Sequence, residues 1–465
     1  MLHCLLDGLL YGVGRLGNIY TLEPSTGVAT LKLALKAAAG DDNPFTALAG
    51  SNFGVDFNPA ADRLRVVSDS DQSLRINVAT GDTITDGNIN LAGGAAVVTA
   101  SAYTSAFSGT SLTELYALDA AAGTSFDQDP PNSGTLVNPV PLGVTGAAVN
   151  GFDIDARTNV GYAAFAAGST GSLYSIDIAA APGTPGATVV GVIAGGEAIM
   201  GLALAATAAP SAIGLTADNR LGAFDPKAPN ALTATTAITG LGAGETVVGI
   251  DVRPSDGLLY ALSSAGKVYS VDAASGAATL KSTLAIDPAD ATAPTFTALA
   301  GSAFSVDFNP VVDRLRIVSD SGQNLRVNVD TGLVMADTDL ARVSAPASVL
   351  ASAYANNFVG ATATMLFNLE QNTDTLTLQA PPNDGTLADV GPLGVDISGS
   401  AAFDIGGGGN GLALAALRSG ATGPHSLYAV SLVTGAATPY RALDAAAAQI
   451  GGASGPALID LAIKF

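Results

Sequence analysis

The segment VDFNPVVDRLRIVSD, residues 306–320, alternates two arginines, Arg314 and Arg316, with strongly apolar residues. A closely similar segment, VDFNPAADRLRVVSD, occupies residues 55–69. Between Val55–Asn77 and Val306–Asn328, 17 of 23 positions are identical, at a constant offset of 251 residues. The chain therefore contains a long internal repeat, and the fold of the repeated unit decides the fold of the protein.

The same offset holds far beyond this segment. SAYTSAF (101–107) returns as SAYANNF (352–358), and PPNSGTL (130–136) returns as PPNDGTL (381–387). GLLY (8–11) also returns, as GLLY (257–260), at the slightly shorter offset of 249 residues. We therefore divide the chain of 465 residues into two copies, 1–205 and 213–465, joined by a short Ala/Pro segment. This length also suits two domains better than one hydrophobic core.

Each copy contains a finer period of roughly 45 to 50 residues, which is the length of a repeat that forms one propeller blade. Residues 248–282, VGIDVRPSDGLLYALSSAGKVYSVDAASGAATLKS, show one whole unit: short apolar runs with alternating patterns, separated by Asp, Asn, Gly and Pro turns. Such runs are typical of strands joined by tight hairpins, and helical periodicity is missing. The pattern predicts an all-β protein made of four-stranded antiparallel β-propeller blades.

The number of blades differs between the copies. The second copy supplies four full units and a set of strands at 213–238, which the final strand ALIDLAIKF (457–465) can complete. The first copy supplies four units, and only MLHCLL (1–6) precedes the first of them as an inner strand. We favour two tandem five-bladed rings with the first incomplete, because rings above eight blades are rare. The alternative is one nine-bladed ring, in which residues 457–465 pair with residues 9–32.

The composition excludes several classes of function. A formal net charge of −21 argues against nucleic acid as a partner, since phosphates require clustered Lys and Arg. No apolar run approaches the roughly 18 residues of a membrane-spanning helix, so we expect no membrane insertion. The single cysteine, Cys4, rules out an internal disulfide and a Cys-based zinc site. With only His3 and His425, histidine-rich metal sites and most catalytic triads are also excluded.

The distribution of polar residues is a compositional hint of export. Lys is scarce, whereas Thr, Ser, Asn and Gly are plentiful. The first residues, MLHCLLDGLLYGVG, show neither the basic start nor the cleavage site of a signal peptide. We expect a secreted or cell-surface protein.

The arginines of the opening segment are the first candidate site. Six of the 13 arginines lie in two short windows and fall on one face of a predicted hairpin: Arg63, Arg65 and Arg75 in the first copy, and Arg314, Arg316 and Arg326 in the second. One interpretation is an Arg–Asp network between neighbouring blades, with Asp307, Asn309, Asp313 and Asp320 as nearby acceptors. The other is a site for an anion, such as a carboxylate, a sulfate or an acidic sugar.

These motifs resemble those of the DUF4394 family. The resemblance rests on DFNP-x-x-DRLR, the following VSD-x-x-Q-x-LR, and PPN-x-GTL, and it covers nearly the whole chain twice. The family has no agreed function, and its members are commonly predicted to be exported. The first copy departs from the pattern at Asp71 and Ser73, where the second has Gly322 and Asn324. It also lacks the opening LTADNRL-like segment, present at 215–221, so we expect an N-terminally incomplete first copy.

Aspartates in the predicted inner strands form the second candidate site: Asp56, Asp153, Asp251, Asp307, Asp404 and Asp460. Inner strands line the central channel of a propeller, so these carboxylates could converge there and bind Ca²⁺ through their oxygens. The alternative is that each carboxylate caps its own turn through backbone N–H groups.

No catalytic residue emerges from these patterns. The first hypothesis for function is therefore a non-enzymatic extracellular binding, structural or interaction module, with a small anionic molecule or a sugar as a possible ligand. The second is a Ca²⁺-dependent propeller hydrolase or lyase acting on a small molecule or a sugar. Because an incomplete ring exposes strand edges, we also predict self-association, as a dimer or filament, through the seam of the first copy.

Overall fold

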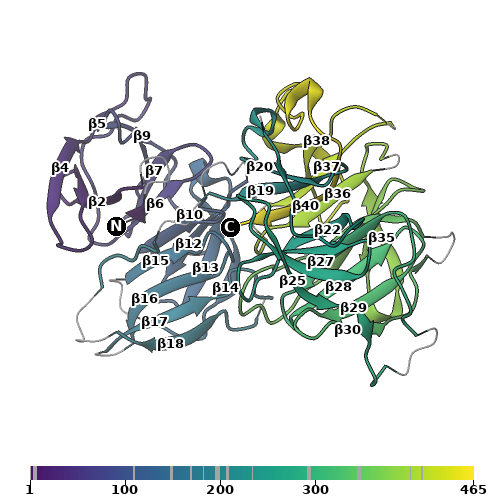
Figure 1. Cartoon of the computed structure of the whole chain (residues 1–465). Helices are drawn as coiled ribbons and strands as arrows, with labels where there is room; N and C mark the ends of the chain where they lie inside the picture. The colour runs from purple at the N-terminus through teal and green to yellow at the C-terminus, as the bar shows by residue number, and fades with distance from the viewer. Residues whose placement is uncertain are drawn as a thin grey trace. The chain divides into compact units, whose positions relative to one another are not determined.

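The computed structural model of the chain divides into two compact units, Met1–Ala209 and Pro210–Phe465. The residues that it describes are 2–3, 8–107, 110, 112–146, 150–167, 170–181, 183–193, 199–205, 209–232, 234–290, 295–342, 347–397, 400–409, 412–420 and 422–465. Figure 1 shows that both units are built from strands. The helices among the described residues are five short 3-10 turns: Pro131–Ser133, Pro229–Ala231, Pro382–Asp384, Tyr440–Ala442 and Gly452–Ser454.

The described strands of the first unit form four sheets, each named here by its strands. The β1–β4 sheet comprises β1 (Leu2–His3), β2 (Leu10–Gly14), β3 (Asn18–Leu22) and β4 (Ala29–Ala34). The β5–β9 sheet comprises β5 (Lys36–Ala37), β6 (Phe53–Asn58), β7 (Arg63–Ser68), β8 (Ser73–Ile76) and β9 (Asp82–Thr85). The β10–β14 sheet comprises β10 (Asn90–Leu91), β11 (Ala100–Tyr103), β12 (Leu115–Asp119), β13 (Thr124–Gln128) and β14 (Thr135–Pro141). The β15–β18 sheet comprises β15 (Asn150–Ile154), β16 (Gly161–Ala167), β17 (Thr170–Ile176) and β18 (Ala187–Val192).

The described strands of the second unit form five sheets. The closing sheet comprises β21 (Thr236–Ala237), β20 (Arg220–Phe224), β19 (Ser211–Thr216) and β40 (Leu458–Lys464). The β22–β25 sheet comprises β22 (Val247–Val252), β23 (Leu259–Ser263), β24 (Lys267–Val271) and β25 (Ala278–Thr283). The β26–β30 sheet comprises β26 (Ala285–Ile286), β27 (Phe304–Asn309), β28 (Arg314–Ser319), β29 (Asn324–Asn328) and β30 (Leu333–Ala336). The β31–β35 sheet comprises β31 (Ala341–Arg342), β32 (Val349–Tyr354), β33 (Leu366–Glu370), β34 (Thr375–Gln379) and β35 (Thr386–Pro392). The β36–β39 sheet comprises β36 (Ala401–Ile405), β37 (Ala413–Leu417), β38 (Ser426–Val430) and β39 (Ala437–Pro439).

The opening segment folds as a hairpin for local chemical reasons. The side-chain oxygen of Asn309 accepts the backbone N–H groups of Val311 (2.9 Å) and Val312 (3.2 Å), which turns the chain directly after β27. Asp313 then adopts a left-handed backbone conformation with φ of 50°, which Asp tolerates better than most residues. The chain re-enters the sheet as β28, with Arg314 opposite Asn309 and Arg316 opposite Asp307.

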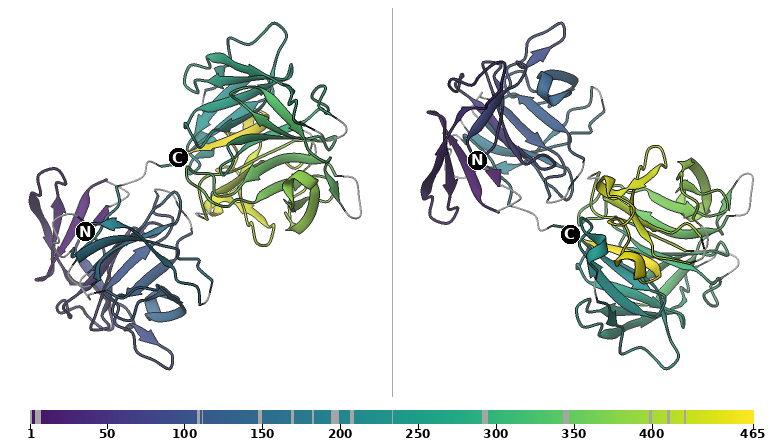
Figure 2. Two further views of the ribbon diagram at one scale, coloured as in Figure 1. Left: turned by 90° about the horizontal axis from the view of Figure 1, so that it is seen from below. Right: turned by 90° about the horizontal axis from the view of Figure 1, so that it is seen from above.

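The last strand of the chain closes the second unit. β40 pairs antiparallel with β19, so the first and last strands of the unit share one sheet. The innermost strands form a closed cycle, in which β22 contacts β27 and β40, β32 contacts β27 and β36, and β36 contacts β40. Figure 2 shows the yellow C-terminal strand among the teal and green strands of this unit. The nine-bladed alternative requires residues 457–465 to pair with residues 9–32, but among the described strands β40 has β19 as its neighbour.

The first unit closes differently. Leu2 and His3 pair with Tyr11 and Leu10, so residues 2–3 supply the inner strand of the first sheet, for which the sequence offered only a weak candidate. The segment 199–205 lies beside β15, because the N–H of Leu204 donates to Asp153 on that strand over 2.7 Å. In the part of the chain that the structure describes, no strand pairs with this segment.

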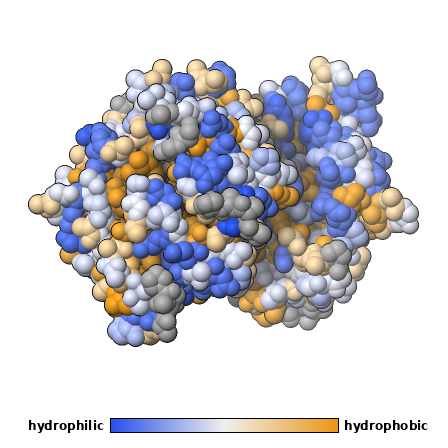
Figure 3. Space-filling model, turned by 90° about the vertical axis from the view of Figure 1, so that its right-hand side faces the viewer, coloured by the Kyte–Doolittle hydropathy of each residue, from blue (hydrophilic) through white to orange (hydrophobic). Residues whose placement is uncertain are grey.

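The core of each unit lies between adjacent sheets. In the second unit, for example, Phe308, Leu315 and Val327 of the β26–β30 sheet pack against Tyr260 and Leu262 of the β22–β25 sheet. Apolar and polar residues are interspersed on the face shown in Figure 3. Among the described residues, no helix has the length and apolar character to cross a membrane.

Candidate functional site

The buried arginine of the opening segment joins two neighbouring sheets of the second unit. Arg316, on β28, is 2% exposed. Its guanidinium group donates to Asp337 (2.6 Å) and Asn324 (2.8 Å) within its own sheet. It also donates to the hydroxyl of Tyr354 (3.1 Å) and to Asn383 (2.9 Å), which lie in the next sheet and in the turn after β34. Arg316 is thus a link between sheets.

A second arginine completes this cluster. Arg326, opposite Arg316 on β29, makes a bidentate pair with Asp337 through Nε (2.7 Å) and Nη2 (2.8 Å). One nearly buried carboxylate therefore pairs with two guanidinium groups and fixes their planes.

The first unit repeats this cluster. Arg65 donates to Asp86 (2.6 Å), Asn132 (2.8 Å) and Tyr103 (3.3 Å), and Arg75 pairs with Asp86 in the same bidentate way. The remaining arginines, Arg63 and Arg314, donate to backbone carbonyls of the preceding turn, 2.8 Å and 3.0 Å away.

The acceptors are not those that sequence proximity indicates. Asp307, Asn309, Asp313 and Asp320 were the nearby candidates, whereas Asp337 and Asp86 take the charge-assisted bonds, 21 residues beyond Arg316 and Arg65. Asp313 pairs instead with Arg253, at 2.6 and 2.8 Å. The repeat itself is the signal that identifies most of the true partners. Three of the four partners of Arg316 recur at the 251-residue offset as partners of Arg65: Asp86 and Asp337, Asn132 and Asn383, and Tyr103 and Tyr354.

The inner-strand aspartates link each inner strand to the next one. Five of the six accept the N–H of the following residue in their own strand, namely Asp56, Asp153, Asp251, Asp404 and Asp460. Each of the six also accepts an N–H from the adjacent inner strand or segment: Asp56 from Tyr103, Asp153 from Leu204, Asp251 from Phe308, Asp307 from Tyr354, Asp404 from Ile463, and Asp460 from Ile250. The carboxylates therefore do more than cap their own turns.

Three of these carboxylates meet in the second unit. One oxygen each from Asp251, Asp307 and Asp404 lies within 4.8 Å of the others, and all three residues are buried. Burial raises the pKa of Asp251 and of Asp307 far above the usual range, and neighbouring carboxylates add to the shift. Burial also raises the pKa of Asp404 to about 6. Such a group can share protons, or it can supply oxygen ligands to a hard cation.

The first unit carries a smaller version of this cluster. Burial raises the pKa of Asp153 to about 6 and that of Asp56 well above its usual range, with Asp153 adding to the shift of Asp56. Gly201 stands where the second unit has Asp460 if Leu204 is aligned with Ile463, as their bonds to the inner-strand aspartates indicate. Among the described residues, the second unit thus brings a group of three carboxylates together, and no such group of three is found in the first unit.

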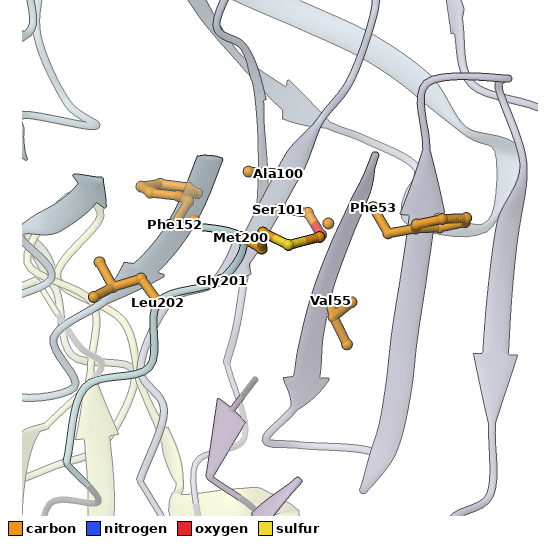
Figure 4. A pocket seen from close by; sticks show the side chains of 10 residues that line it. Phe53, Val55, Ala100, Ser101, Phe152, Met200, Gly201 and Leu202 are labelled. Carbon is orange, nitrogen blue, oxygen red and sulfur yellow. The ribbon is translucent and has the colours of Figure 1, made fainter. Parts of the chain in front are cut away.

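A small cavity of about 30 Å³ lies in the first unit, between β6, β11, β15 and residues 200–202 (Figure 4). Its lining combines apolar side chains with glycines and one hydroxyl: Phe53, Gly54, Val55, Ala100, Ser101, Gly151, Phe152, Met200, Gly201 and Leu202. Ser101 is 1% exposed, and its Oγ has no hydrogen-bond partner among the described residues. A volume of this size suits about one ordered water.

His425 has a structural environment. Its Nδ1 accepts the N–H of Leu458 on β40 (3.2 Å), and its Nε2 lies 3.2 Å from Ser400 Oγ. Burial lowers its pKa to about 4, so the ring is neutral at physiological pH. The side chains of His3 and Cys4 lie outside the described residues.

A family model supports the resemblance noted from the motifs. The model described as a domain of unknown function, DUF4394, matches residues 5–203 and 220–452. The chain belongs to the DUF4394 family. A search of curated proteins found no match.

Solved structures show a weak likeness. The structure of the Dos1 propeller is 13% identical, over 67% of this chain and 72% of that chain, with a TM-score of 0.27. The crystal structure of a nidogen/laminin complex is 10% identical, over 69% of this chain and 89% of that chain, also with a TM-score of 0.27. The propeller-like description of this DUF4394 protein therefore rests on its own sheets and inner strands.

Proposed function

We propose that this DUF4394 protein is a non-enzymatic, exported β-propeller module of two five-bladed-type copies, acting as a binding or structural scaffold at the cell surface or outside the cell. The observation that carries the proposal is the use of its buried ionisable residues. Arg65 and Arg316 join neighbouring sheets, and the inner-strand aspartates join neighbouring strands. Side chains engaged in this way rigidify a scaffold.

Calorimetry and turnover assays on the full chain test this role. We expect saturable heat with some member of a panel of sugars, lactones and small anions, with no turnover of any of them. Steady turnover of a panel member, lost in Asp307→Asn, would instead establish the alternative of a Ca²⁺-dependent hydrolase or lyase. Binding of an anion at the six arginines stays a prediction, and their protein contacts favour the structural interpretation.

A second candidate function is binding of Ca²⁺ in the second unit. The observation that favours it is the convergence of Asp251, Asp307 and Asp404, whose carboxylate oxygens are the ligands that Ca²⁺ prefers. Here we expect Ca²⁺ to raise the melting temperature relative to a chelator, because a ligand of the native state stabilises it. An equal melting temperature under both conditions at pH 8 would remove this candidate.

Self-association through the seam of the first copy is also part of the proposal. β1 reduces the open edge on one side of that seam, because it pairs with β2. The other side, around residues 199–205, keeps an unpaired inner segment within the described chain. Sedimentation over a range of concentrations tests the association, and a strictly monomeric chain would exclude it.

A further inference from the structure

The three carboxylates that meet in the second unit differ in how many hydrogen bonds they accept. Asp251 and Asp404 each accept two backbone N–H groups, one from the next residue of their own strand and one from the adjacent inner strand. Asp307 accepts a single N–H group, that of Tyr354, at one oxygen over 3.1 Å. In the described chain, no N–H group donates to the other oxygen of Asp307, although the residue is only 1% exposed.

The unused oxygen of Asp307 has a local cause. The N–H group of Phe308, the next residue of the strand, donates to Asp251 on the neighbouring inner strand over 2.7 Å. In the first unit, the equivalent N–H group of Phe57 stays within its own strand and donates to Asp56, also over 2.7 Å. Asp251 therefore takes the donor that the repeat otherwise gives to the aspartate at this position.

The side chain of Asp307 is directed at the other carboxylates. One oxygen each from Asp251, Asp307 and Asp404 lies within 4.8 Å of the others. Burial is the main cause of the raised pKa of Asp404, and a hydrogen-bonding contact with the carboxyl of Asp307 acts in the opposite direction on that pKa. Oxygens at such separations can bind one cation together, since Ca²⁺ takes carboxylate oxygens at about 2.3–2.6 Å.

The charge of this cluster is not balanced by basic side chains. In the described chain, the donors to Asp251, Asp307 and Asp404 are backbone N–H groups, and no Lys or Arg pairs with them. Asp460 adds negative charge: burial is the main cause of the raised pKa of Asp251 and Asp307, and the charge of Asp460 adds to both shifts. When the three carboxyls are ionised, a divalent cation leaves one negative charge uncompensated in a buried site, which is costly, whereas a trivalent cation balances all three.

We propose that Asp307 anchors one hard cation, which Asp251 and Asp404 also bind, and that this site binds a trivalent lanthanide ion more tightly than Ca²⁺. The inference rests on the proposed binding of Ca²⁺ in the second unit. It deepens that proposal by naming the anchoring ligand and the charge of the cation that suits the site.

The same reasoning predicts that the first unit lacks this site. Leu2 lies opposite Tyr11 as Asp251 lies opposite Tyr260, so the first unit has an apolar residue at the position of Asp251. Both oxygens of Asp56 accept N–H groups, from Phe57 and Tyr103. We therefore expect one cation per chain.

Luminescence of Tb³⁺ on the full chain at neutral pH tests the proposal. The ion is excited through tyrosine, because the chain contains no Trp. We expect saturable binding of one Tb³⁺ per chain. Competition should show that Ca²⁺ displaces Tb³⁺ only at a concentration roughly tenfold higher or more, since the buried site holds three negative charges.

Two variants separate the anchoring ligand from other carboxylates. Asp307→Asn should weaken Tb³⁺ binding by roughly tenfold or more, because it removes the charged oxygen that no N–H group occupies. Asp56→Asn, at the equivalent position of the first unit, and Asp384→Asn, at an exposed position, should leave the affinity unchanged. The melting temperature of Asp307→Asn in chelator checks its folding, and it should match that of the unaltered chain, since the Asn oxygen can still accept the N–H group of Tyr354.

A second ligand variant keeps the test open if Asp307→Asn fails to fold. Asp251→Asn retains an oxygen for the N–H group of Phe308 and removes one charge, so it should also weaken Tb³⁺ binding. Equal Tb³⁺ affinity in these variants and in the unaltered chain would overturn the inference, as would Ca²⁺ bound as tightly as Tb³⁺. If Ca²⁺ still raises the melting temperature in that case, the candidate Ca²⁺ function stands without the assigned anchor. Absence of Tb³⁺ binding, together with equal melting temperatures in Ca²⁺ and chelator, would remove both.

Discussion

The two units share one arginine cluster and differ in what surrounds it. Arg65 and Arg316 have the same kinds of partner at nearly the same distances, and both join a sheet to its neighbour. By contrast, the second unit closes through β40, whereas in the described part of the first unit no strand pairs with residues 199–205. The link between adjacent sheets is therefore independent of closure of the whole ring, because each link involves two neighbouring sheets only.

Removal of β40 should have the largest effect on stability, and this effect should be confined to the second unit. Deletion of residues 457–465 takes away the strand that pairs with β19 and the N–H group that Asp404 accepts. We expect the second unit to lose its cooperative thermal transition, while hydrogen exchange of residues 9–32 stays at its original rate. Ile463→Val, which keeps the strand, serves as the control. Faster exchange at residues 9–32 in the deletion variant would contradict the separate closure of the two units.

Replacement of Arg316 or Arg65, the arginines that link neighbouring sheets, should cause the next largest loss of stability. Arg316→Leu leaves Asp337 buried with Arg326 as its remaining partner, and Arg65→Leu does the same to Asp86. Loss of one member of a buried ion pair costs about 3–5 kcal/mol in free energy of unfolding. Calorimetry should therefore show each variant lowering a different one of two transitions.

The matched controls for these variants come from the same strands. Arg314→Leu and Arg63→Leu remove arginines that bond to backbone carbonyls near the surface, so their effect should stay within about 0.5 kcal/mol. Equal losses for Arg314→Leu and Arg316→Leu would show that the cluster around Asp337 has no special role.

Titration of the inner-strand aspartates should change the stability of the two units by an intermediate amount. Asp404 and Asp153 have pKa values raised to about 6, so the native state holds their protons more tightly than the unfolded chain does. The associated stability is present in full below about pH 4, falls as the pH rises towards 6, and is lost above that pH. Each carboxyl should contribute on the order of 3 kcal/mol to this fall.

Denaturant unfolding at several pH values between 4 and 8 measures how steeply the free energy of unfolding falls as the pH rises. Asp404→Asn should weaken the pH dependence of the stability of the second unit. The control Asp384→Asn, at an exposed position, should leave that pH dependence unchanged. If Ca²⁺ binds at Asp251, Asp307 and Asp404, it should restore stability at pH 8 and have no effect at pH 4, where the carboxyls are protonated. A stability that rises from pH 4 to pH 7 in the unaltered chain would contradict the assigned pKa shifts.

Sequence patterns predicted the all-β fold class because the strands of one sheet come from one short stretch of the chain. Short alternating runs and turn residues lie within one unit of the repeat, so the all-β assignment needed no knowledge of distant contacts. The pairing of β40 with β19 joins residues about 250 apart, and two sites in the chain competed for that strand. Periodicity alone does not resolve such a competition.

The candidate site was predictable only in part for the same reason. Residue types drew attention to Arg316 and Asp307, which the structure shows to be buried and hydrogen-bonded, but they did not indicate their partners. Asp337 reaches Arg316 because β30 and β28 flank β29, a register that no short motif specifies. Comparison of the two copies at equal offsets would have found Asp86 and Asp337, since charged residues held in both copies stand out in a chain with few of them.

The smallest predicted change in stability concerns a series of side-chain hydrogen bonds in the second unit, for which the first unit lacks one residue. Ser352 donates to Asn368 (2.7 Å), and Asn368 donates to Gln379 (3.3 Å), which bonds on to Asn324 beside Arg316. The first unit has Ala117 at the position of Asn368. Ser101 Oγ and Gln128 Oε1, the counterparts of the two atoms that Asn368 contacts, have no partner among the described residues.

Ala117→Asn should therefore stabilise the first unit, because it would give both orphaned atoms a partner across the same strands. Ser101 lies directly opposite Ala117, as Ser352 lies opposite Asn368, so the register already suits the new side chain. Two satisfied buried groups are worth roughly 1–2 kcal/mol, and Asn368→Ala should cost the second unit a similar amount. Ala117→Leu is the volume control: it fills the same space without hydrogen bonds and should destabilise by about 1–3 kcal/mol. If Asn and Leu at position 117 lower the transition of the first unit equally, the space beside Ser101 is closed and the orphaned atoms cannot be rejoined by a side chain.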